Sequence, residues 1–406
     1  MGGTVVSEPG LDRRQLLRLF GAIGAAGVAG PALAACGSAD GSAADTTPVR
    51  IGMIVPQAGG NKPIGDDLIA GFQLYLNLHG SRLGGHPIQL IMAEEGDSAE
   101  TGRAAVDKLI KEHAVQVMSG VAGSTVMTAI RDQVEAAQVP LLGSNASPNT
   151  LGSVKYIWRT SYVNDEAGRA LGGYLATRRN QSVYVVSDDS EPAREQVSGF
   201  LRTFNGLPGH PDVVGDPVQI PLVSSPNLPL GSYLNAIHAS GARTVFAAFS
   251  ADTAIPFFKA WRAAGMSTPI YAPGFVTEGP TALRDLGDSV SGLYTAMNYA
   301  PDLDNGANRT FASAFQQLYN MLPSTYAMAS YDAAAVLDKA LALAGSDLSP
   351  QSINTALSEL GEIDSPRGSW QFNQTRTPLQ RWYLRQVRRE GVVLTNTLLS
   401  DLAMLG

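Results

Sequence analysis

The chain has 406 residues, of which 44% are hydrophobic and 16% are charged, and its formal net charge is −7 at pH 7. A chain of this length and composition can bury a large core in about two domains, and its acidic balance argues against nucleic acid as a partner, because that requires a basic surface. The single cysteine cannot form an internal disulfide, so the fold must depend on its hydrophobic core alone.

Residues 1–35 have the parts of an export signal. Three arginines, Arg13, Arg14 and Arg18, precede or border an uncharged apolar stretch over residues 19–35. This stretch is too short and too rich in glycine and alanine to predict a membrane-spanning helix. The Arg13-Arg14 pair resembles a twin-arginine signal, which implies export of the chain from the cytoplasm.

The cysteine lies directly after this stretch. Leu33, Ala34, Ala35 and Cys36 together resemble the lipobox of bacterial lipoproteins. The resemblance implies that Cys36 is acylated, becomes the first residue of the mature chain and anchors it to the outer face of the bacterial cell membrane. Residues 36–48 are small and polar, as in a flexible tether. The alternatives are an ordinary buried cysteine, or a cleaved signal with an incidental cysteine.

From residue 49 the sequence alternates between short apolar runs and stretches with helical spacing. The expected strands cover residues 49–56, 86–94, 114–121 and 139–147, and the expected helices cover 65–80, 99–113 and 123–138. Asp66 and Asp67 suit the start of the first helix, where the helix dipole favours negative charge. This alternation predicts parallel strands joined by helical crossovers.

The same alternation begins again in the second half of the chain. Further strands are expected at 182–190, 212–223, 243–250 and 268–276, and helices at 192–205, 229–240 and 251–265. They are followed by a strand at 291–301, helices at 307–321, 325–344 and 349–360, and an antiparallel hairpin within 368–394 that turns at 389–391. The predicted fold class is therefore α/β, with two doubly wound, parallel-sheet domains in tandem rather than one large sheet.

Recognisable catalytic patterns are missing from the sequence. It contains no phosphate-binding loop ending in Gly-Lys-Ser/Thr, no nucleophile elbow, no HExxH motif and no paired CxxC motifs. Asp188, Asp189 and Glu191 form an acidic cluster that could hold a cation, but a solvated loop or the edge of a polar pocket is the more ordinary explanation. We therefore expect a protein that is not an enzyme and that binds no metal or cofactor.

Polar loops follow the expected strands, and open parallel sheets bind ligands at the carboxyl ends of their strands. In the first domain these loops read QAGGNK, SGVAGS and GSNASPN, with short donors and acceptors at Ser124, Ser144, Asn145 and Ser147. Free backbone N–H groups at a helix start suit a carboxylate, and glycine lets that backbone approach closely. The alternative is ordinary turn and capping chemistry.

The corresponding loops of the second domain read SDDSEP, AFSADT and APGFVTEGP. In these loops Phe249, Phe275, Asp189 and Glu278 could cover and orient a small molecule. The two sets of loops together predict a cleft with one polar face and one partly aromatic face, as small-ligand sites often have. Phe249 and Phe275 could equally well belong to the core.

Five segments carry a family pattern through their order and spacing: IGMIVPQAGG, QVMSGVAGSTV, VPLLGSNASP, YIWRTSYVNDEAGRALGGYL and TYAMASYDAAAVLDKAL. Over residues 49–395 the chain resembles the periplasmic binding proteins of ABC importers, of the type that includes the leucine/isoleucine/valine-binding protein. The resemblance implies two lobes, 49–160 plus 292–367 and 161–291 plus 368–406, joined by crossovers near 158–162, 290–295 and 368–374. A solute would bind between the lobes and close them about this hinge, and the closed monomer would dock on a membrane permease while other chains hydrolyse ATP.

The resemblance also implies ligand contacts on both lobes. On lobe one the implied contacts are Gly123, Ser124, Ser144, Asn145, Ala146, Ser147 and Tyr326. On the first crossover the implied contact is Tyr162, and on lobe two they are Asp189, Ser250, Phe275 and Glu278. In amino-acid binders an acidic residue near Gly274 usually takes the ligand ammonium, and Glu278 is the nearest carboxylate in this chain. An amino acid and a less charged aromatic or carboxylic solute therefore both remain open as ligands.

Three functions are compatible with this sequence. The first is lipid-anchored solute binding that feeds an ABC importer. The second is a sensor of the same fold that signals to a membrane receptor, which a neighbouring permease gene would argue against. The third is an exported enzyme on a doubly wound scaffold, because a fold does not fix a function. The missing catalytic patterns favour the first two.

Overall fold

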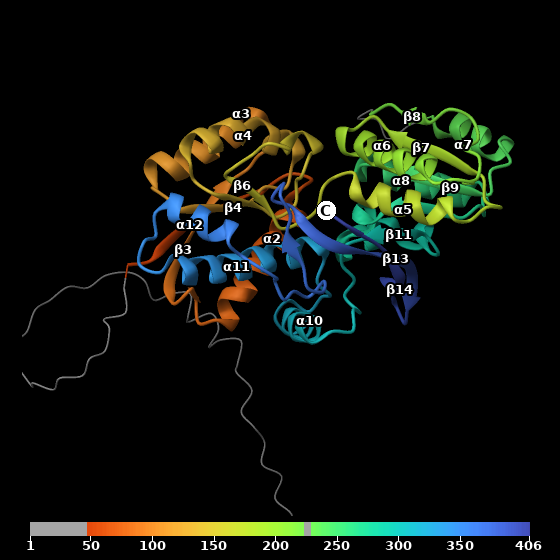
Figure 1. The fold of residues 1–406 in the computed structure, drawn as a ribbon. Coiled ribbons are helices and arrows are strands. Elements are labelled where there is room, and N and C mark those ends of the chain that lie inside the picture. The colour runs from red at the N-terminus through yellow and green to blue at the C-terminus, as the bar shows by residue number, and fades with distance from the viewer. Residues whose placement is uncertain (1–46, 223–228) are drawn as a thin grey trace, which may run out of the picture. The chain divides into compact units, whose positions relative to one another are not determined.

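The computed structural model describes residues 47–222 and 229–406. The expected export signal, Cys36 and most of the tether therefore lie outside the described residues. Within the described ranges, no helix is both long and apolar enough to cross a membrane. The chain forms two separate sheets, each with helices packed on both faces (Figure 1).

The first sheet has six strands in the order β2-β3-β1-β4-β5-β6. They are β1 (Val49–Val55), β2 (Arg82–Leu83), β3 (His86–Glu94), β4 (Val117–Gly120), β5 (Leu141–Gly143) and β6 (Ile157–Arg159). All neighbouring strands are parallel except β2 and β3, and the register of β1 on β3 runs from Val49 opposite Ile88 to Val55 opposite Glu94. The carboxyl ends of the parallel strands therefore share one edge of the sheet.

Helices cover both faces of the first sheet, which explains the continuous apolar sequence of its strands. They are α2 (Lys62–Leu78), α3 (Ala99–Asp107), α4 (Ser124–Ala137), α11 (Thr325–Ala344) and α12 (Pro350–Ser358). Val49, Ile51 and Met53 of β1 belong to the core with α2 and α11, whereas Ile54 belongs to the core with α3 and α4. Successive side chains of one strand thus serve opposite faces.

The second sheet has eight strands in the order β12-β13-β11-β10-β9-β7-β8, with β14 also paired to β13. They are β7 (Val183–Asp188), β8 (Val218–Ile220), β9 (Thr244–Ala248), β10 (Ile270–Pro273), β11 (Tyr294–Met297), β12 (Gln371–Phe372), β13 (Pro378–Glu390) and β14 (Val393–Leu405). The pairs from β8 to β11 are parallel, and β13 is antiparallel to β11, β12 and β14.

Helices also cover both faces of the second sheet. They are α5 (Glu166–Ala176), α6 (Glu191–Gly206), α7 (Leu230–Ala239), α8 (Ala251–Ala263) and α9 (Gly279–Leu286). Val185 of β7 packs in the core with α5 and α6, and the adjacent Val186 packs in the core with α7, α8 and α9. One more helix, α10 (Gly306–Tyr319), packs against α2 and α11 through Phe311 and Phe315.

The chain passes between the two sheets three times. It leaves the first sheet after β6, returns from β11 to α10 and α11, and leaves again between α12 and β13. Two doubly wound, largely parallel sheets linked in this way confirm the predicted fold class. The hairpin at the end of the chain is also confirmed, with its turn at Gly391 and Val392.

The structure differs from the sequence-based expectation mainly at element ends. Helix α2 begins at Lys62 with a proline in its first turn, so Asp66 and Asp67 lie inside it rather than at its start. Strand β11 stays in the second sheet as far as Met297, so the boundary expected at residue 292 is too early. The pattern does not predict α9, and it ends the hairpin well before Leu405.

Candidate functional site

The loop after β4 leads into α4, and its backbone N–H groups already have an acceptor. Glu95, which directly follows β3, accepts hydrogen bonds from the N–H of Ala122 at 2.8 Å and of Gly123 at 2.7 Å. The Glu95 side chain is buried, and burial raises its pKa to about 7. The N–H of Gly123, which we expected to be free for a ligand, is therefore bound to an internal carboxylate.

The loop after β5 places a run of buried residues at the same edge of the sheet. The Asn145 side chain donates to the carbonyl of Ala122 at 2.8 Å and accepts from the Tyr162 hydroxyl at 2.6 Å. Ser147 is fully buried, and its hydroxyl has no hydrogen-bond partner among the described residues. Because buried polar groups are normally satisfied, this hydroxyl is a candidate ligand contact.

The other predicted residues of these loops have internal partners. The Ser144 hydroxyl lies 3.4 Å from the carbonyl of Leu142 and is fully buried. Ala146 belongs to the core beside α4. The Ser124 hydroxyl accepts a hydrogen bond from the Asn164 side chain at 3.3 Å. These residues shape the edge of the sheet, and none of them presents a free polar group comparable to that of Ser147.

Aromatic side chains from both parts of the chain gather near Asn145. The rings of Tyr162 and Phe275 lie 4.8 Å apart in a tilted arrangement, and Trp382 lies 6.4 Å from Tyr162. Tyr326 is the second residue of α11 and is buried. Burial raises the pKa of both tyrosines, and Glu278 adds to this effect, so both hydroxyls stay neutral. We call Asn145, Tyr162, Phe275, Glu278 and Tyr326 the boundary site.

Glu278 is the carboxylate of the boundary site, and it is already paired. One of its oxygens lies 2.5 Å from Nη2 of Arg385, and the other accepts a hydrogen bond from the N–H of Thr325 at 3.0 Å. Both charged side chains are almost fully buried. The carboxylate that the family resemblance assigns to a ligand ammonium therefore has a cation of its own.

A second carboxylate lies nearby on α2. The Asp67 side chain accepts a hydrogen bond from the Ser324 hydroxyl, at the start of α11. Burial raises its pKa to about 6, and the negative charge of Glu278 adds to the rise. Asp67 has no cationic partner among the described residues, in contrast to Glu278.

The remaining predicted residues of the second sheet are bound elsewhere. Asp189 is exposed and pairs with Arg194 at 2.7 Å, while Asp188, at the end of β7, is the buried carboxylate of this loop. Asp188 accepts hydrogen bonds from the backbone N–H and the hydroxyl of Ser250, so the Ser250 hydroxyl is not free for a ligand. Phe249 lies in the core next to Phe257, so the packing alternative holds for it.

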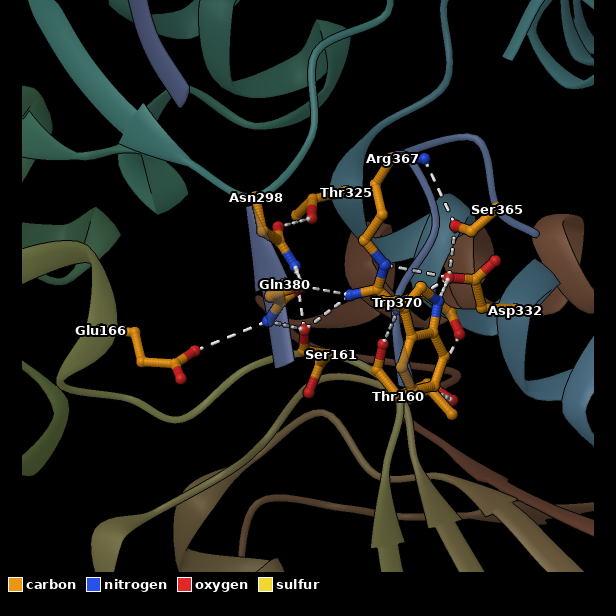
Figure 2. Close-up of polar contacts among 12 residues, drawn as sticks. Thr160, Ser161, Glu166, Asn298, Thr325, Asp332, Ser365, Arg367, Trp370 and Gln380 are labelled. Carbon is orange, nitrogen blue, oxygen red and sulfur yellow. Dashed lines mark hydrogen bonds and ion pairs between the residues drawn. The ribbon is translucent and has the colours of Figure 1, made fainter. Parts of the chain in front are cut away.

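A separate buried polar group joins the three connections between the sheets (Figure 2). Arg367 donates to Oδ2 of Asp332 through Nε at 3.0 Å and Nη2 at 2.6 Å. It also donates to the carbonyls of Thr160 and Ser161. Burial raises the pKa of the Asp332 carboxyl, and the Arg367 charge works in the opposite direction. We call this group the connection network.

Two amides complete the connection network. Gln380 and Asn298 both donate to the carbonyl of Ser161, at 2.9 and 2.8 Å, and the Asn298 amide also donates to Gln380 at 2.9 Å. Asn298 in turn accepts from the Thr325 hydroxyl at 2.8 Å. Groups from all three connections thus depend on one another: the first supplies the carbonyls of Thr160 and Ser161, and the other two supply side chains. The sequence analysis did not anticipate any of them.

Two hollows of the described chain lie away from the boundary site. One has a volume of about 230 Å³ and is lined by residues of α8 and β11, including Trp261 and Tyr294. The other is shallower and lies beside Gln181 and Arg243. Neither contains a residue predicted to bind ligand. Within the boundary site, the Tyr162 ring packs on Phe275 and its hydroxyl is bound to Asn145.

Comparisons with known proteins extend over nearly all of the described chain. Residues 48–391 match the periplasmic binding protein family. A curated relative, the Leu/Ile/Val-binding protein homolog 6 of Brucella suis biovar 1, is 26% identical over 86% of this chain and 90% of its own length.

Solved structures show the same fold. A solute-binding protein of an ABC transporter from R. palustris, in complex with benzoate, is 27% identical, with a TM-score of 0.75 over 88% of this chain and 99% of its own. The branched-chain amino acid transporter substrate-binding protein of Streptococcus pneumoniae, in complex with isoleucine, is 16% identical, with a TM-score of 0.76 over 87% of this chain and all of its own.

These matches fit the geometry described above. The family and its structural neighbours are solute-binding proteins and not enzymes, in agreement with the missing catalytic patterns. The two solved structures share the fold of nearly all of this chain, with TM-scores of 0.75 and 0.76. The chain therefore belongs to the periplasmic binding protein family.

Proposed function

We propose that this protein is the lipid-anchored, extracytoplasmic solute-binding subunit of an ABC importer, and that it takes a small carboxylic acid with an aromatic or branched apolar body. The solute would bind between a lobe formed by 49–160 and 298–367 and a lobe formed by 161–297 and 368–406. This division follows the expected lobes, with the second boundary moved to the end of β11.

Contacts across the boundary support a closing motion. Glu195 on α6 accepts the N–H of Asn149, which belongs to the other sheet's loops, at 2.9 Å. It also accepts from the Asn164 side chain at 2.8 Å. Glu278 and Thr325 make a second such contact. Contacts of this kind form on closure and are lost on opening, so a ligand that adds further contacts would favour the closed state.

The observation that carries the proposed ligand class is the neighbourhood of Tyr162. Its ring packs on Phe275, its hydroxyl is fixed by Asn145, and the buried Ser147 hydroxyl in the same loop lacks a partner. Aromatic walls with one or two placed polar groups suit a small apolar solute with a polar end. The R. palustris protein that binds benzoate supports this class of ligand.

A free amino acid is the second candidate, and Asp67 favours it. This carboxylate has a raised pKa and no cationic partner among the described residues, so a ligand ammonium would stabilise its charged form. The isoleucine complex of the S. pneumoniae protein is consistent with an amino acid, although its low identity compares only the fold.

Replacing Ser147 with alanine should weaken ligand binding by about tenfold, because a hydrogen bond to a buried, charged ligand is lost. The variant should fold normally, because the hydroxyl it removes has no protein partner. Isothermal titration with benzoate, its 4-hydroxy derivative, leucine and isoleucine measures the effect. The exposed Ser232→Ala change is the matched control and should leave the affinity unchanged.

Two results would contradict this proposal. One is unchanged affinity in the Ser147→Ala variant. The other is that no compound of the panel binds and that native mass spectrometry of the purified protein detects no co-purified small molecule.

The lipid anchor makes a separate prediction. Full-length protein expressed in bacteria fed with radiolabelled palmitate should incorporate the label and sediment with membranes, and Cys36→Ala should abolish both, because Cys36 is the only cysteine. Label that persists in the variant, or a wild-type chain recovered without label, would show that the protein is not a lipoprotein. Neither result would bear on ligand binding.

A further inference from the structure

Glu278 and Arg385 form a buried ion pair at the boundary site. Glu278 lies between the turn after β10 and α9, and Arg385 lies on β13, where it is paired with β11 on one side and β14 on the other. The side chains are 3% and 1% exposed, and an oxygen and a nitrogen of the pair are 2.5 Å apart. Burying these charges together is tolerable only because each neutralises the other.

The position of Arg385 depends on a glycine. A Cβ atom at Gly274 would lie 2.4 Å from Nη2 of Arg385, so a side chain at that position would force the guanidinium to move. The guanidinium is also held from other sides, because Nη1 donates to the carbonyl of Tyr299 at 2.8 Å and Nε to the Thr295 hydroxyl at 3.3 Å. Gly274 thus provides the space in which the cation is fixed.

The two oxygens of Glu278 face different groups, and the one nearest Arg385 makes an ion pair but no hydrogen bond. One faces Arg385, and the other accepts the N–H of Thr325 at the start of α11. Thr325 is followed by Tyr326, so the pair lies directly at the residues that would face a solute. A ligand ammonium next to Glu278 would compete with Arg385 for the same carboxylate. It would also be repelled by the guanidinium, which is held in place by its other hydrogen bonds.

We infer that Arg385 determines ligand specificity by occupying the place of a ligand ammonium, so that the site accepts carboxylic acids without an α-amino group and rejects the corresponding amino acids. The inference rests on the proposed function, since it assumes that the boundary site binds the solute. On this inference, the Glu278–Arg385 ion pair decides whether the site binds a carboxylic acid or a free amino acid. Rejection by a misplaced fixed charge is a common way to obtain specificity.

Asp67 is the competing acceptor for an ammonium group. It lies on the other side of the boundary, with Oδ2 3.6 Å from the Cβ position of Gly279, next to Glu278. Its Ser324 hydrogen bond supplies only a neutral donor. If Asp67 outweighs Arg385, the wild-type protein binds amino acids and the Asp67→Asn variant does not.

Matched ligand pairs test the inference without any variant. Hydrocinnamate and L-phenylalanine differ only in the α-ammonium group, and so do isocaproate and L-leucine. Isothermal titration of the wild-type protein should show that each desamino acid binds at least about tenfold more tightly than its amino acid. Equal affinities, or tighter binding of an amino acid that Asp67→Asn abolishes, would overturn the inference.

Variants then locate the effect. Arg385→Met frees Glu278 and should shift the affinity ratio by about tenfold or more towards the amino acid. Gly274→Ala should shift it in the same direction, because its Cβ displaces the guanidinium. Arg385→Lys keeps the cation and is the matched control, and Glu278→Gln combined with Arg385→Met removes both charges and should abolish the shift. Circular dichroism confirms folding of each variant.

The outcomes separate the inference from the proposed function. If the wild type binds both members of a pair equally, the inference fails and the function stands. The inference also fails, and the function stands, if folded Arg385→Met and Gly274→Ala proteins keep the wild-type ratio of affinities for the desamino acid and the amino acid. If neither the wild type nor any variant binds any of the four compounds, the proposed ligand class fails and the inference fails with it.

Discussion

Replacing Arg367 with methionine should lower the free energy of unfolding by about 3–5 kcal/mol, because it leaves the carboxylate of Asp332 buried without its cation. Both side chains are almost fully buried, and one oxygen of Asp332 accepts from Arg367, Ser365 and Trp370 together. The Arg367 guanidinium also satisfies the carbonyls of Thr160 and Ser161, which would lose these donors (Figure 2).

Urea unfolding followed by circular dichroism measures this loss. Removing both charges, with Arg367→Met and Asp332→Leu together, should be less harmful than the single change, because no unpaired buried charge remains. Arg309→Met is the matched control, since Arg309 pairs with Asp304 at the surface and should contribute little. A single Arg367 variant as stable as the wild type, or a double variant less stable than the single one, would contradict this account.

The connection network also bears on the proposed closing motion. It holds side chains of the second and third connections to the backbone of the first, so any rotation of one sheet against the other changes their surroundings. Contacts in a hinge that persist in both states guide the motion, whereas contacts that break oppose it. The Arg367 variant should therefore alter ligand affinity as well as stability, even though Arg367 does not belong to the boundary site.

Most of the fold could be predicted from the sequence because burial on both faces leaves a clear pattern. The strand at 86–94 and the helix at 325–344 have the predicted limits, since each is a long apolar segment between breaks in the pattern. Short strands were less predictable. Strand β5 covers only Leu141–Gly143, because the expected strand continues into a buried loop that makes side-chain hydrogen bonds instead of a ladder.

The site was less predictable than the fold, for a physical reason. Glycine, serine and asparagine at strand ends indicate the edge where Asn145 and Ser147 lie, but sequence does not show which polar group already has a partner. The Glu95 carboxylate accepts a hydrogen bond from the N–H of Gly123, and Arg385 forms an ion pair with Glu278. Both interactions join residues that are far apart in the sequence. Such pairings depend on tertiary structure.

Some signals for these pairings exist in the sequence. Asp332 is a charge inside a helix that is apolar on almost every side, so a buried partner could have been expected. Arg385 follows Leu384 in a strand whose alternation suggests that it faces solvent. It is buried because β13 lies between β11 and β14 and helices cover both faces of the sheet. The alternation rule assumes one exposed face, and β13 has none over residues 382–385, where four successive side chains are buried.

Glu166 should make the protein less stable as the pH rises, and Glu166→Gln should remove this effect. Glu166 is fully buried at the start of α5, and one of its oxygens has no hydrogen-bond partner among the described residues. Burial raises its pKa to about 7, and the neighbouring Asp165 adds to the rise, while Arg169 and the N–H of Val163 oppose it. The folded protein therefore prefers the protonated carboxyl.

The direction of the effect follows from the two pKa values. The pKa of Glu166 is raised from its ordinary value of 4.5 to about 7 by folding. The stability that its protonated form provides is complete below pH 4.5 and is lost as the pH rises through 7. A shift of this size corresponds to at most about 3 kcal/mol. Glutamine has nearly the same shape as glutamate and no charge, so the Glu166→Gln variant does not lose stability in this pH range through this position.

Urea unfolding of both proteins near pH 5 and pH 8 should show similar stability at the lower pH, with the Glu166→Gln protein about 2–3 kcal/mol more stable at the higher one. The exposed Glu112→Gln change is the matched control and should give no pH-dependent difference. Asp67 and Glu95 also have raised pKa values, so the wild type and the variant should both lose stability with rising pH, and only their difference reports on Glu166. A difference of the same size at both pH values would show that Glu166 is charged throughout, held by contacts with Arg159 or Arg169 that outweigh its burial.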